Sequence, residues 1–406
     1  MNTEFIEGGI CAPKGFQASG VHCGIRNNTS KNDLSLIVSD VMCSAAAVYT
    51  KNKVKGAPLL VTKEHLADGK AVAVICNSGN ANTCAPNGME IAVKTCELLA
   101  QKLNAKPEDI IVASTGVIGQ PMSMEPFDKG IPEAIAKLNN NGSEEAAFGI
   151  MTTDTVKKEF AVKFELGGKE CKIGGIAKGS GMIHPNMATM LCFLTTDAAI
   201  SSDLLRKALS ADIVDTFNQL SVDGDTSTND MVSVMANGLC GNVLIEKEGE
   251  DFDAFCKALN QVTSEIVKAL AKDGEGAGKL LECIVTGAPD KETARAISKS
   301  VITSSLFKAA MFGEDANWGR VLCAIGYADA EFDIDKVDVS LASAKGKVDV
   351  CKGAAYNEYS EDEASIILKE DEILILVSLN QGEAEAKAWG CDLTYSYVEI
   401  NGSYRS

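Results

Sequence analysis

Histidine is scarce in this sequence, with three residues among 406, and His22, His65 and His184 are far apart along the chain. Few histidines are therefore present to build a Ser-His-Asp triad or the metal site of a zinc hydrolase. Fourteen cysteines are present, but no two have the CxxC spacing of a zinc ribbon or a thioredoxin-type site. We expect the thiols to be reduced and mostly buried as small apolar side chains.

Long apolar runs and an excess of positive charge are also missing. No apolar run approaches the roughly 18 residues of a membrane helix. The N-terminal segment carries Glu4 and Glu7 and has no apolar stretch, so we do not expect a signal peptide. Acidic residues outnumber basic ones by 56 to 38, for a net charge of -18, which disfavours nucleic-acid and membrane-surface partners. These absences predict a cytoplasmic protein.

Hydrophobic residues make up 46% of the chain, enough for a large core built mainly from aliphatic side chains because aromatics are only 5%. Apolar runs at 71–77 and 110–115 predict buried strands, and helical periodicity at 89–103 lies between them. Residues 160–166 alternate before Gly167-Gly168, which predicts a hairpin, whereas the polar stretch 138–147 predicts an exposed loop.

The C-terminal half also mixes apolar residues at helical spacing with apolar residues at strand spacing. Apolar residues from Phe252 to Leu270 recur along one helical face. Four further segments are predicted as strands: 337–342, 345–351, 364–369 and 372–379. The whole pattern predicts a layered α/β protein with helices packed on sheets.

Two familiar motifs are nearly present and then fail. Gly274–Lys279 resembles a phosphate-binding loop, but Lys279 is followed by Leu280 and the segment follows a helix. Ser305 and Lys308 form an S-x-x-K pair without the companion motifs of the enzymes that use it. Neither motif supports a function.

The segment from Ala177 to Ala198 combines a Gly-rich loop, Lys178 and a buried run that begins just after Thr189. One interpretation is a loop that enters a core strand. The other is catalytic: cleavage between Ala188 and Thr189 would free an α-amino group with an unperturbed pKa of about 7.7–8.0. That amine would lie beside the Thr189 hydroxyl and could act as its base, which a weak hydroxyl nucleophile needs.

An acyl-transfer enzyme also needs hydrogen-bond donors for the developing oxyanion. Thr115 and Gly116 follow the strand predicted at 110–115 and offer a hydroxyl and a flexible backbone N–H. A simple turn at the end of a strand is the alternative interpretation.

Taken together, six strings of the sequence resemble the ornithine acetyltransferase (ArgJ) family, also called glutamate N-acetyltransferase. The resemblance runs nearly from end to end of the chain, and the HPNMATML and VDGDTSTND strings are the most specific. The six strings are Cys76–Asn82, Ala113–Gly119, Met151–Thr155, Lys178–Leu191, Phe217–Asp230 and Phe312–Arg320.

The resemblance implies a two-lobed, self-cleaving fold of the N-terminal-nucleophile type, with residues 1–188 as an α chain and 189–406 as a β chain. Thr189 would be the nucleophile, and Thr115 and Gly116 would hold the oxyanion. The implied substrate contacts are Thr152 (or its neighbour Thr153), Lys178, Thr189, Glu275, Asn401 and Ser406. Gly278 stands where the family usually has a threonine, and Ser406 where a terminal threonine is common.

The implied activity is a ping-pong transfer, in arginine biosynthesis, of the acetyl group from N2-acetylornithine to glutamate. It needs no metal or organic cofactor, and no residue decides whether acetyl-CoA is also a donor. An α2β2 heterotetramer is implied as well. A self-cleaving peptidase or amidase with the same nucleophile, and a non-catalytic amino-acid-binding protein, are the alternatives.

Overall fold

The structure, a computed structural model, describes residues 3–184 and 190–403. The chain divides into two compact units, each built from several separate stretches of sequence. The first contains the described parts of 1–179, 185–214 and 226–266, and the second contains 180–184, 215–225 and the described part of 267–406. Each unit therefore includes residues from both sides of the predicted cleavage point, and the division into α and β chains stays a prediction.

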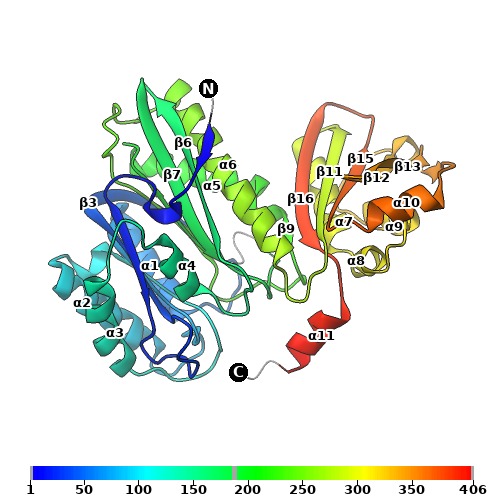
Figure 1. Cartoon of the computed structure of the whole chain (residues 1–406). Helices are drawn as coiled ribbons and strands as arrows, with labels where there is room; N and C mark the ends of the chain where they lie inside the picture. Colours follow the sequence, from blue (N-terminus) through cyan, green and yellow to red (C-terminus); the bar gives the residue numbers. More distant parts are fainter. Residues whose placement is uncertain (1–2, 185–189, 404–406) are drawn as a thin grey trace. The chain divides into compact units, whose positions relative to one another are not determined.

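A mixed nine-stranded sheet organises the first unit (Figure 1). Its order is β1-β6-β7-β8-β10-β3-β4-β5, and β2 also pairs with β3. The strands are β1 (Glu4–Ile6), β2 (Phe16–Val21), β3 (Leu34–Tyr49), β4 (Lys70–Asn77), β5 (Ile110–Ser114), β6 (Lys158–Leu166), β7 (Lys169–Lys178), β8 (Leu191–Thr196) and β10 (Met231–Ala236).

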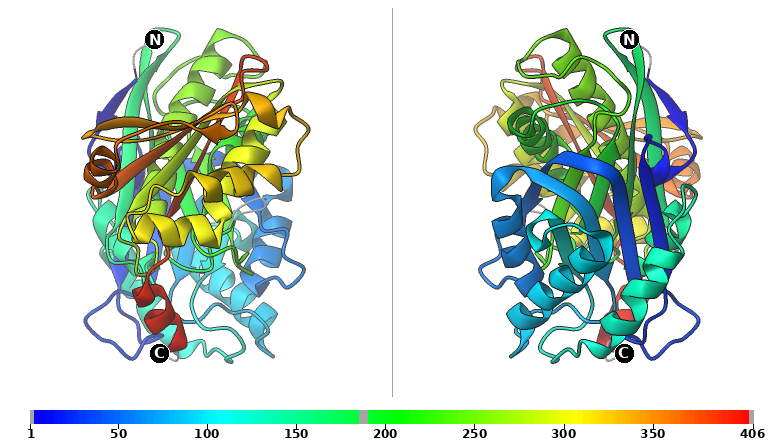
Figure 2. Two further views of the ribbon diagram at one scale, coloured as in Figure 1. Left: turned by 90° about the vertical axis from the view of Figure 1, so that its right-hand side faces the viewer. Right: turned by 90° about the vertical axis from the view of Figure 1, so that its left-hand side faces the viewer.

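Helices cover both faces of this sheet (Figure 2). In β5, Ile110 and Val112 pack with helices α2 (Gly88–Leu103) and α3 (Glu125–Ala136), whereas Ile111 and Ala113 face the side of α4 (Ser143–Ile150). Helix α1 (Ala57–His65) packs beside β5, and α5 (Ser202–Asp215) follows β8 along the chain. Because side chains alternate along a strand, a strand covered on both faces should be apolar, as β5 is from Ile110 to Ala113.

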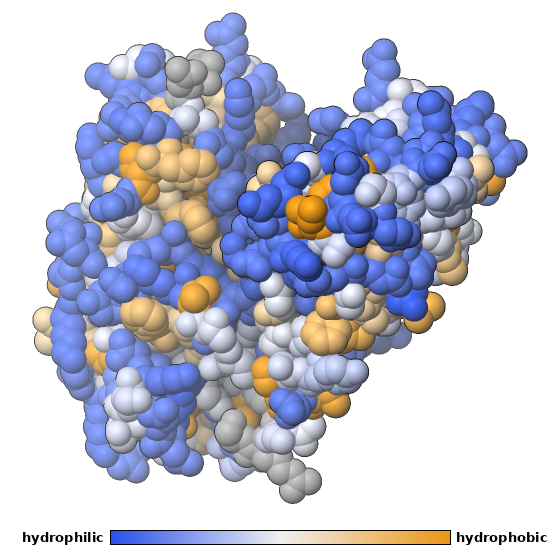
Figure 3. Space-filling model, turned by 45° about the vertical axis from the view of Figure 1, so that its right-hand side comes forward, coloured by the Kyte–Doolittle hydropathy of each residue, from blue (hydrophilic) through white to orange (hydrophobic). Residues whose placement is uncertain are grey.

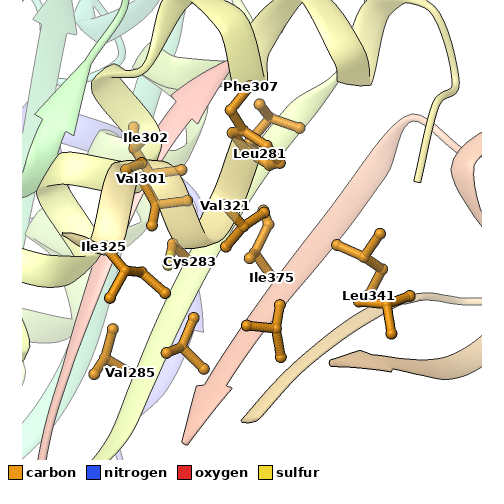
Figure 4. Packing of buried hydrophobic residues seen from close by; sticks show 14 of the residues in the cluster. Leu281, Cys283, Val285, Val301, Ile302, Phe307, Val321, Ile325, Leu341 and Ile375 are labelled. Carbon is orange, nitrogen blue, oxygen red and sulfur yellow. The ribbon is translucent and has the colours of Figure 1, made fainter. Parts of the chain in front are cut away.

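A seven-stranded sheet organises the second unit in the order β14-β13-β12-β15-β11-β16-β9. One apolar core joins it to four helices, and Figure 4 shows Leu281, Cys283 and Val285 of β11 meeting side chains of these helices. The strands are β9 (Leu220–Ser221), β11 (Leu280–Ala288), β12 (Asp338–Ser343), β13 (Gly346–Lys352), β14 (Ala355–Tyr356), β15 (Glu372–Ser378) and β16 (Ala384–Cys391). The helices are α7 (Lys291–Thr303), α8 (Ser305–Phe312), α9 (Trp318–Gly326) and α10 (Glu361–Leu368).

Most of the predicted elements are confirmed. The runs at 71–77 and 110–115 are β4 and β5, the helix at 89–103 is α2, and the Gly167-Gly168 hairpin joins β6 to β7. The periodic face from Phe252 to Leu270 lies in α6 (Glu250–Lys272), with Phe255, Leu259 and Leu270 fully buried.

Two secondary-structure predictions are wrong. Residues 364–369, predicted as a strand, lie mostly in α10, because Ser360 caps the helix and acidic residues at 361–363 fill its first turn. Ala364, Ile367 and Leu368 then bury one helical face. The predicted loop at 138–147 ends early because α4 begins at Ser143 and buries its apolar face.

The surface is mainly polar. The face visible in Figure 3 is largely hydrophilic, with hydrophobic residues in small groups. Within residues 3–184 and 190–403, none of the helices combines the length and the apolar character needed to cross a bilayer. The fourteen cysteines are free in this structure. Most are buried, a prediction that is confirmed, while Cys84 and Cys323 are exposed.

Candidate active site

Three neighbouring strands of the first unit, β7, β8 and β10, bring Lys178, Leu191 and Met231 together at one end of the sheet. β7 ends at Lys178, whose register partner in the antiparallel β8 is Leu191. Leu191 in turn lies opposite Met231 in the parallel β10. The end of β7 and the starts of β8 and β10 are therefore adjacent.

Ala188 and Thr189, the predicted cleavage pair, lie outside the described residues. Met190, the next residue, is buried, and its carbonyl accepts a hydrogen bond from the Met231 N–H at 2.9 Å. Beside the start of β8, the described residues are thus Lys178 at the end of β7 and Asp230 just before β10.

Asp154 organises the surroundings of Lys178. Its carboxylate forms a fully buried ion pair with Lys158 at 2.7 Å and accepts the Gly179 N–H at 2.6 Å. Burial alone would raise the pKa of Asp154, but Lys178 and Lys158 outweigh it and hold that pKa below its usual range. Lys178 is 4.0 Å from the same carboxylate, so its ammonium keeps donors for an anionic substrate group. The Thr152 N–H donates to Asp154 at 3.0 Å.

Thr152 and Thr153 are both half-buried beside Asp154. The backbone bond made by Thr152 leaves its hydroxyl as a candidate contact, and Thr153 also makes a polar interaction of its own. The choice between the two threonines stays a prediction.

Asp230 is a second buried carboxylate at this end of the sheet. It is 2% exposed, and its Oδ2 has no hydrogen-bond partner among the described residues. Burial raises the pKa of Asp230 well above its usual range, although Ser227 and Lys178 act in the opposite direction. An unsatisfied buried oxygen is costly, and a catalytic or ligand-binding role is one of the reasons for which native proteins keep such an atom.

The predicted oxyanion turn is held by buried asparagines. The Thr115 N–H donates to the Asn77 carbonyl at 2.9 Å, and the Ser114 hydroxyl donates to the Asn77 side chain at 2.6 Å. The Asn229 side-chain amide donates to the Ser114 carbonyl at 2.9 Å. Because Asn229 immediately precedes Asp230, this bond ties the turn to the end of the sheet where Lys178 lies.

Gly116 has a backbone conformation that other residues rarely adopt, with φ of 130°. A Cβ at this position would lie 2.3 Å from the Gly79 carbonyl carbon. We expect Gly116→Ala to displace the turn and to lower kcat by roughly 100-fold, since loss of one oxyanion donor typically costs that much. Steady-state kinetics with acetylornithine as donor measure the effect.

Gly119→Ala is the matched control, because Gly119 also has a positive φ, 84°, but its added Cβ meets no atom within 4 Å. It should share the backbone strain without the clash. Equal losses of kcat in the two variants would remove Gly116 from the catalytic turn.

The other two described candidates lie in the second unit and contact each other. Glu275 is 9% exposed, and its Oε2 accepts the Asn401 side-chain amide at 2.8 Å. Asn401 belongs to α11 (Tyr395–Gly402), whose cap Thr394 also donates its hydroxyl to the Gly276 carbonyl at 2.6 Å. Ser406 lies outside the described residues.

Gly278, the departure from the family pattern, donates its N–H to Asp392 at 2.8 Å. A Cβ at this position would lie 3.1 Å from the Asp392 carboxylate, so a larger residue would require that side chain to shift.

The second unit also holds the segment that precedes the predicted cleavage point. The Asp223 carboxylate accepts the N–H groups of Met182 and Ile183 at 2.6 and 2.9 Å. The Nζ of Lys308 donates to the Val222 carbonyl, so the S-x-x-K lysine has a structural bond.

Lys299, in α7, binds the segment just before Val222. Its Nζ donates to the carbonyls of Asn218, at 2.8 Å, and Leu220. Burial lowers its pKa to about 7. The unfolded chain, with a lysine pKa of about 10.4, therefore binds more protons than the folded chain between pH 7 and 10.

Lys299 should therefore make the free energy of unfolding increase as the pH rises from 7 to 10. From pH 7 to 9 we expect the wild-type protein to gain roughly 2 kcal/mol relative to Lys299→Met, which has no group to titrate. Thermal unfolding at matched pH values measures the difference. Parallel pH profiles would show that Lys299 stays charged when folded.

The sequence analysis did not single out Asp154, Asp223, Asn229 and Asp230. All four lie inside strings that were recognised, MTTDT and VDGDTSTND, but spacing did not show which side chains would be buried beside Lys178 or the turn. Lys178, the start of β8 and the turn bonded to Asn229 share one end of the sheet, and this arrangement fits the predicted acyl-transfer enzyme.

Comparison with known proteins identifies the family. The ArgJ family model matches residues 17–406, and the chain belongs to this family. It is 49% identical over 404 residues to the arginine biosynthesis bifunctional protein ArgJ of Caldanaerobacter subterraneus, covering 99% of this chain and 100% of the relative. It is 51% identical over 393 residues to ArgJ 1 of Clostridium acetobutylicum, with 96% of each chain covered.

Solved structures of family members are also similar. ArgJ from Bacillus halodurans has 46% identity and a TM-score of 0.50, over 52% of this chain and 98% of the solved chain. Ornithine acetyltransferase from Mycobacterium tuberculosis, complexed with ornithine, has 34% identity and a TM-score of 0.43, over 46% of this chain and 100% of the solved chain.

The chain is accordingly a bifunctional acetyltransferase of arginine biosynthesis. The mixed α/β class with two sheets, of the ornithine acetyltransferase type, is confirmed. Family membership favours acetyl transfer over the peptidase and binding-protein alternatives.

Proposed function

We propose that this enzyme moves the acetyl group of N2-acetylornithine to glutamate through Thr189, which becomes an N-terminal residue when the chain cuts itself after Ala188. The observation that carries the proposal is the strand register: Lys178 and Asp230 flank the start of β8, which begins two residues after Thr189 in the sequence. The asparagine-held turn at Thr115 is bonded to the same end of the sheet.

In the first half-reaction, the Thr189 hydroxyl oxygen attacks the acetyl carbonyl and passes its proton to the α-amine of the same residue. The Thr115 hydroxyl and the Gly116 N–H donate to the oxyanion. The C–N bond then breaks, ornithine leaves with the proton, and an acetyl ester of Thr189 remains. In the second half-reaction, the amine of glutamate attacks this ester, which releases N-acetylglutamate and restores the hydroxyl.

Charge supports the assignment of the substrate groups. Lys178 suits a substrate carboxylate, because its ion pair with Asp154 is long, at 4.0 Å, and leaves its ammonium able to donate to another anion. Glu275 suits a substrate ammonium, and Asn401 fixes its carboxylate. Thr152 and Ser406 remain predicted contacts to the amino-acid substrate.

Chain length supports the cleavage. A cut after Ala188 would leave pieces of 188 and 218 residues, each about half of this chain. The match to the solved Bacillus halodurans chain takes in 98% of that chain but only 52% of this one. The solved chain is therefore about the size of one such piece.

The word bifunctional in the relatives' names supports acetyl-CoA as a second acetyl donor, for direct acetylation of glutamate. A cytoplasmic location and an α2β2 assembly belong to the same proposal.

The deciding experiment pairs the denatured masses of the purified protein with an acetyl-transfer assay. We expect two chains, the second beginning Thr-Met-Leu-Cys, and labelled acetyl groups that pass from acetylornithine to glutamate but not to water. One intact chain of 42.8 kDa that still transfers acetyl groups would refute the role of cleavage. Release of acetate alone would favour an amidase.

A further inference from the structure

A pair of thiols lies apart from the residues assigned to acetyl transfer, at another place in the first unit. Cys171 belongs to β7 and Cys240 follows β10, and their Sγ atoms are 2.7 Å apart. Cys171 is 0% exposed and Cys240 8%. Two sulfur atoms at this separation need little movement to form a covalent bond.

The topology explains how residues 69 positions apart in the sequence meet. β7 and β10 are not neighbours, because β8 lies between them. The chain after β10 turns over the end of β8: the Asn237 N–H donates to the Thr196 carbonyl at 3.1 Å and the Cys240 N–H to the Asp197 carbonyl at 2.8 Å. This turn carries Cys240 across β8 to Cys171.

The surroundings of the pair are polar and ordered. The Asp197 carboxylate accepts the N–H groups of Lys172 at 2.7 Å and Lys14 at 3.1 Å, and the Asn242 side-chain oxygen lies 2.9 Å from the Cys240 sulfur. The hydrogen bond from Cys171 lowers the pKa of Cys240, whereas the hydrogen bond to Cys240 and burial raise that of Cys171. Cys240 is thus the better nucleophile and the more exposed thiol.

Cys171, Asp197 and Cys240 also offer three ligand atoms within 4.8 Å of one another, so a metal ion is the rival interpretation. Two sulfurs bound tetrahedrally to one zinc ion, each at about 2.3 Å, lie about 3.8 Å apart. The observed sulfur separation is much shorter. Both Asp197 oxygens, moreover, already accept backbone N–H groups.

We propose that Cys171 and Cys240 form a redox-sensitive pair that a hydroperoxide converts to a disulfide. The Cys240 thiolate attacks one peroxide oxygen, the O–O bond breaks, and hydroxide leaves, which gives a sulfenic acid. The Cys171 sulfur then attacks the Cys240 sulfur, and its proton leaves with the sulfenic hydroxyl as water. Two thiols are oxidised, and one hydrogen peroxide is reduced to two waters.

This bond would join the two sides of the predicted cleavage point. Where the chain is cut after Ala188, a consequence that rests on the proposed function, Cys171 lies in the α chain and Cys240 in the β chain. The disulfide would then be the covalent link between the two chains.

Peptide mapping of the complete, unsubstituted protein tests the proposal. Trypsin releases Cys171 in residues 170–172 and Cys240 in residues 208–247, each as the only cysteine of its peptide. After a few equivalents of hydrogen peroxide, we expect the linked pair of peptides to be about ten-fold more abundant than after dithiothreitol. Cys171→Ser and Cys240→Ser should each abolish the link, whereas Cys323→Ser, at an exposed cysteine, should retain it.

The mapping result does not depend on self-cleavage, because the linked peptides form in a cut or an uncut chain. In a cut chain, non-reducing denaturing electrophoresis should also show the two pieces joined in the oxidised protein. Absence of the linked peptides while Cys84 or Cys323 is oxidised would overturn the proposal. Stoichiometric zinc, measured by elemental analysis and protecting both thiols from peroxide, would overturn it in favour of a metal site.

Discussion

Thr189→Ala should leave the protein as a single chain of 42.8 kDa and abolish acetyl transfer. The side-chain oxygen is needed twice in the proposed chemistry. It attacks the preceding carbonyl when the chain is cut, and it attacks the acetyl carbonyl in each turnover. Alanine removes the oxygen while keeping a small residue before the buried strand β8.

Intact mass and labelled-acetyl transfer to glutamate measure the two losses. Thr189→Ser keeps a hydroxyl and should retain both reactions at a reduced rate. Thr155→Ala, at an exposed threonine of the MTTDT string, should be cleaved and active like the unsubstituted enzyme. A cleaved and active Thr189→Ala protein would place the nucleophile elsewhere.

Lys178→Met should raise the KM for acetylornithine roughly 10- to 100-fold, the loss expected when a charge-assisted hydrogen bond of about 1.5–3 kcal/mol is removed. Lys178 is only 8% exposed, so water compensates poorly for the missing ammonium. Asp154 would keep its 2.7 Å ion pair with Lys158, and we therefore expect the fold to persist. Initial rates over a range of acetylornithine concentrations, with the unfolding midpoint, separate binding from stability.

Lys157→Met is the matched control, because it removes a lysine from a partly exposed ion pair with Glu159 in the same region. Such pairs contribute little, and its KM should stay near that of the unsubstituted enzyme. An unchanged KM in Lys178→Met would exclude an ion pair between this lysine and the substrate. A large rise in KM in both variants would indicate that substrate binding depends on the overall positive charge of this region and not on Lys178 in particular.

Local sequence patterns determined most of the secondary structure and the family. The continuous apolar runs of β4 and β5 and the periodic face of α6 are local signals, because a strand or helix displays its burial at a fixed spacing. The same logic failed at 364–369, where apolar residues suited a strand, but Ser360 and three acidic residues began a helix instead. Cap residues outside the apolar run decided that case.

The strings around Thr115, Lys178 and Thr189 indicated acyl transfer through their resemblance to the ornithine acetyltransferase family, because their residue types alone also allowed a simple loop and a simple turn. Only the tertiary structure decided which other side chains serve them. Asp154 lies 24 residues before Lys178, and Asn229 lies 115 residues after Ser114, yet each pair is in contact.

Cys171 and Cys240 meet for the same reason, since the chain after β10 turns across β8. Such contacts depend on which strands pair and in what register. That choice is made by the burial of the whole sheet, and no local spacing records it.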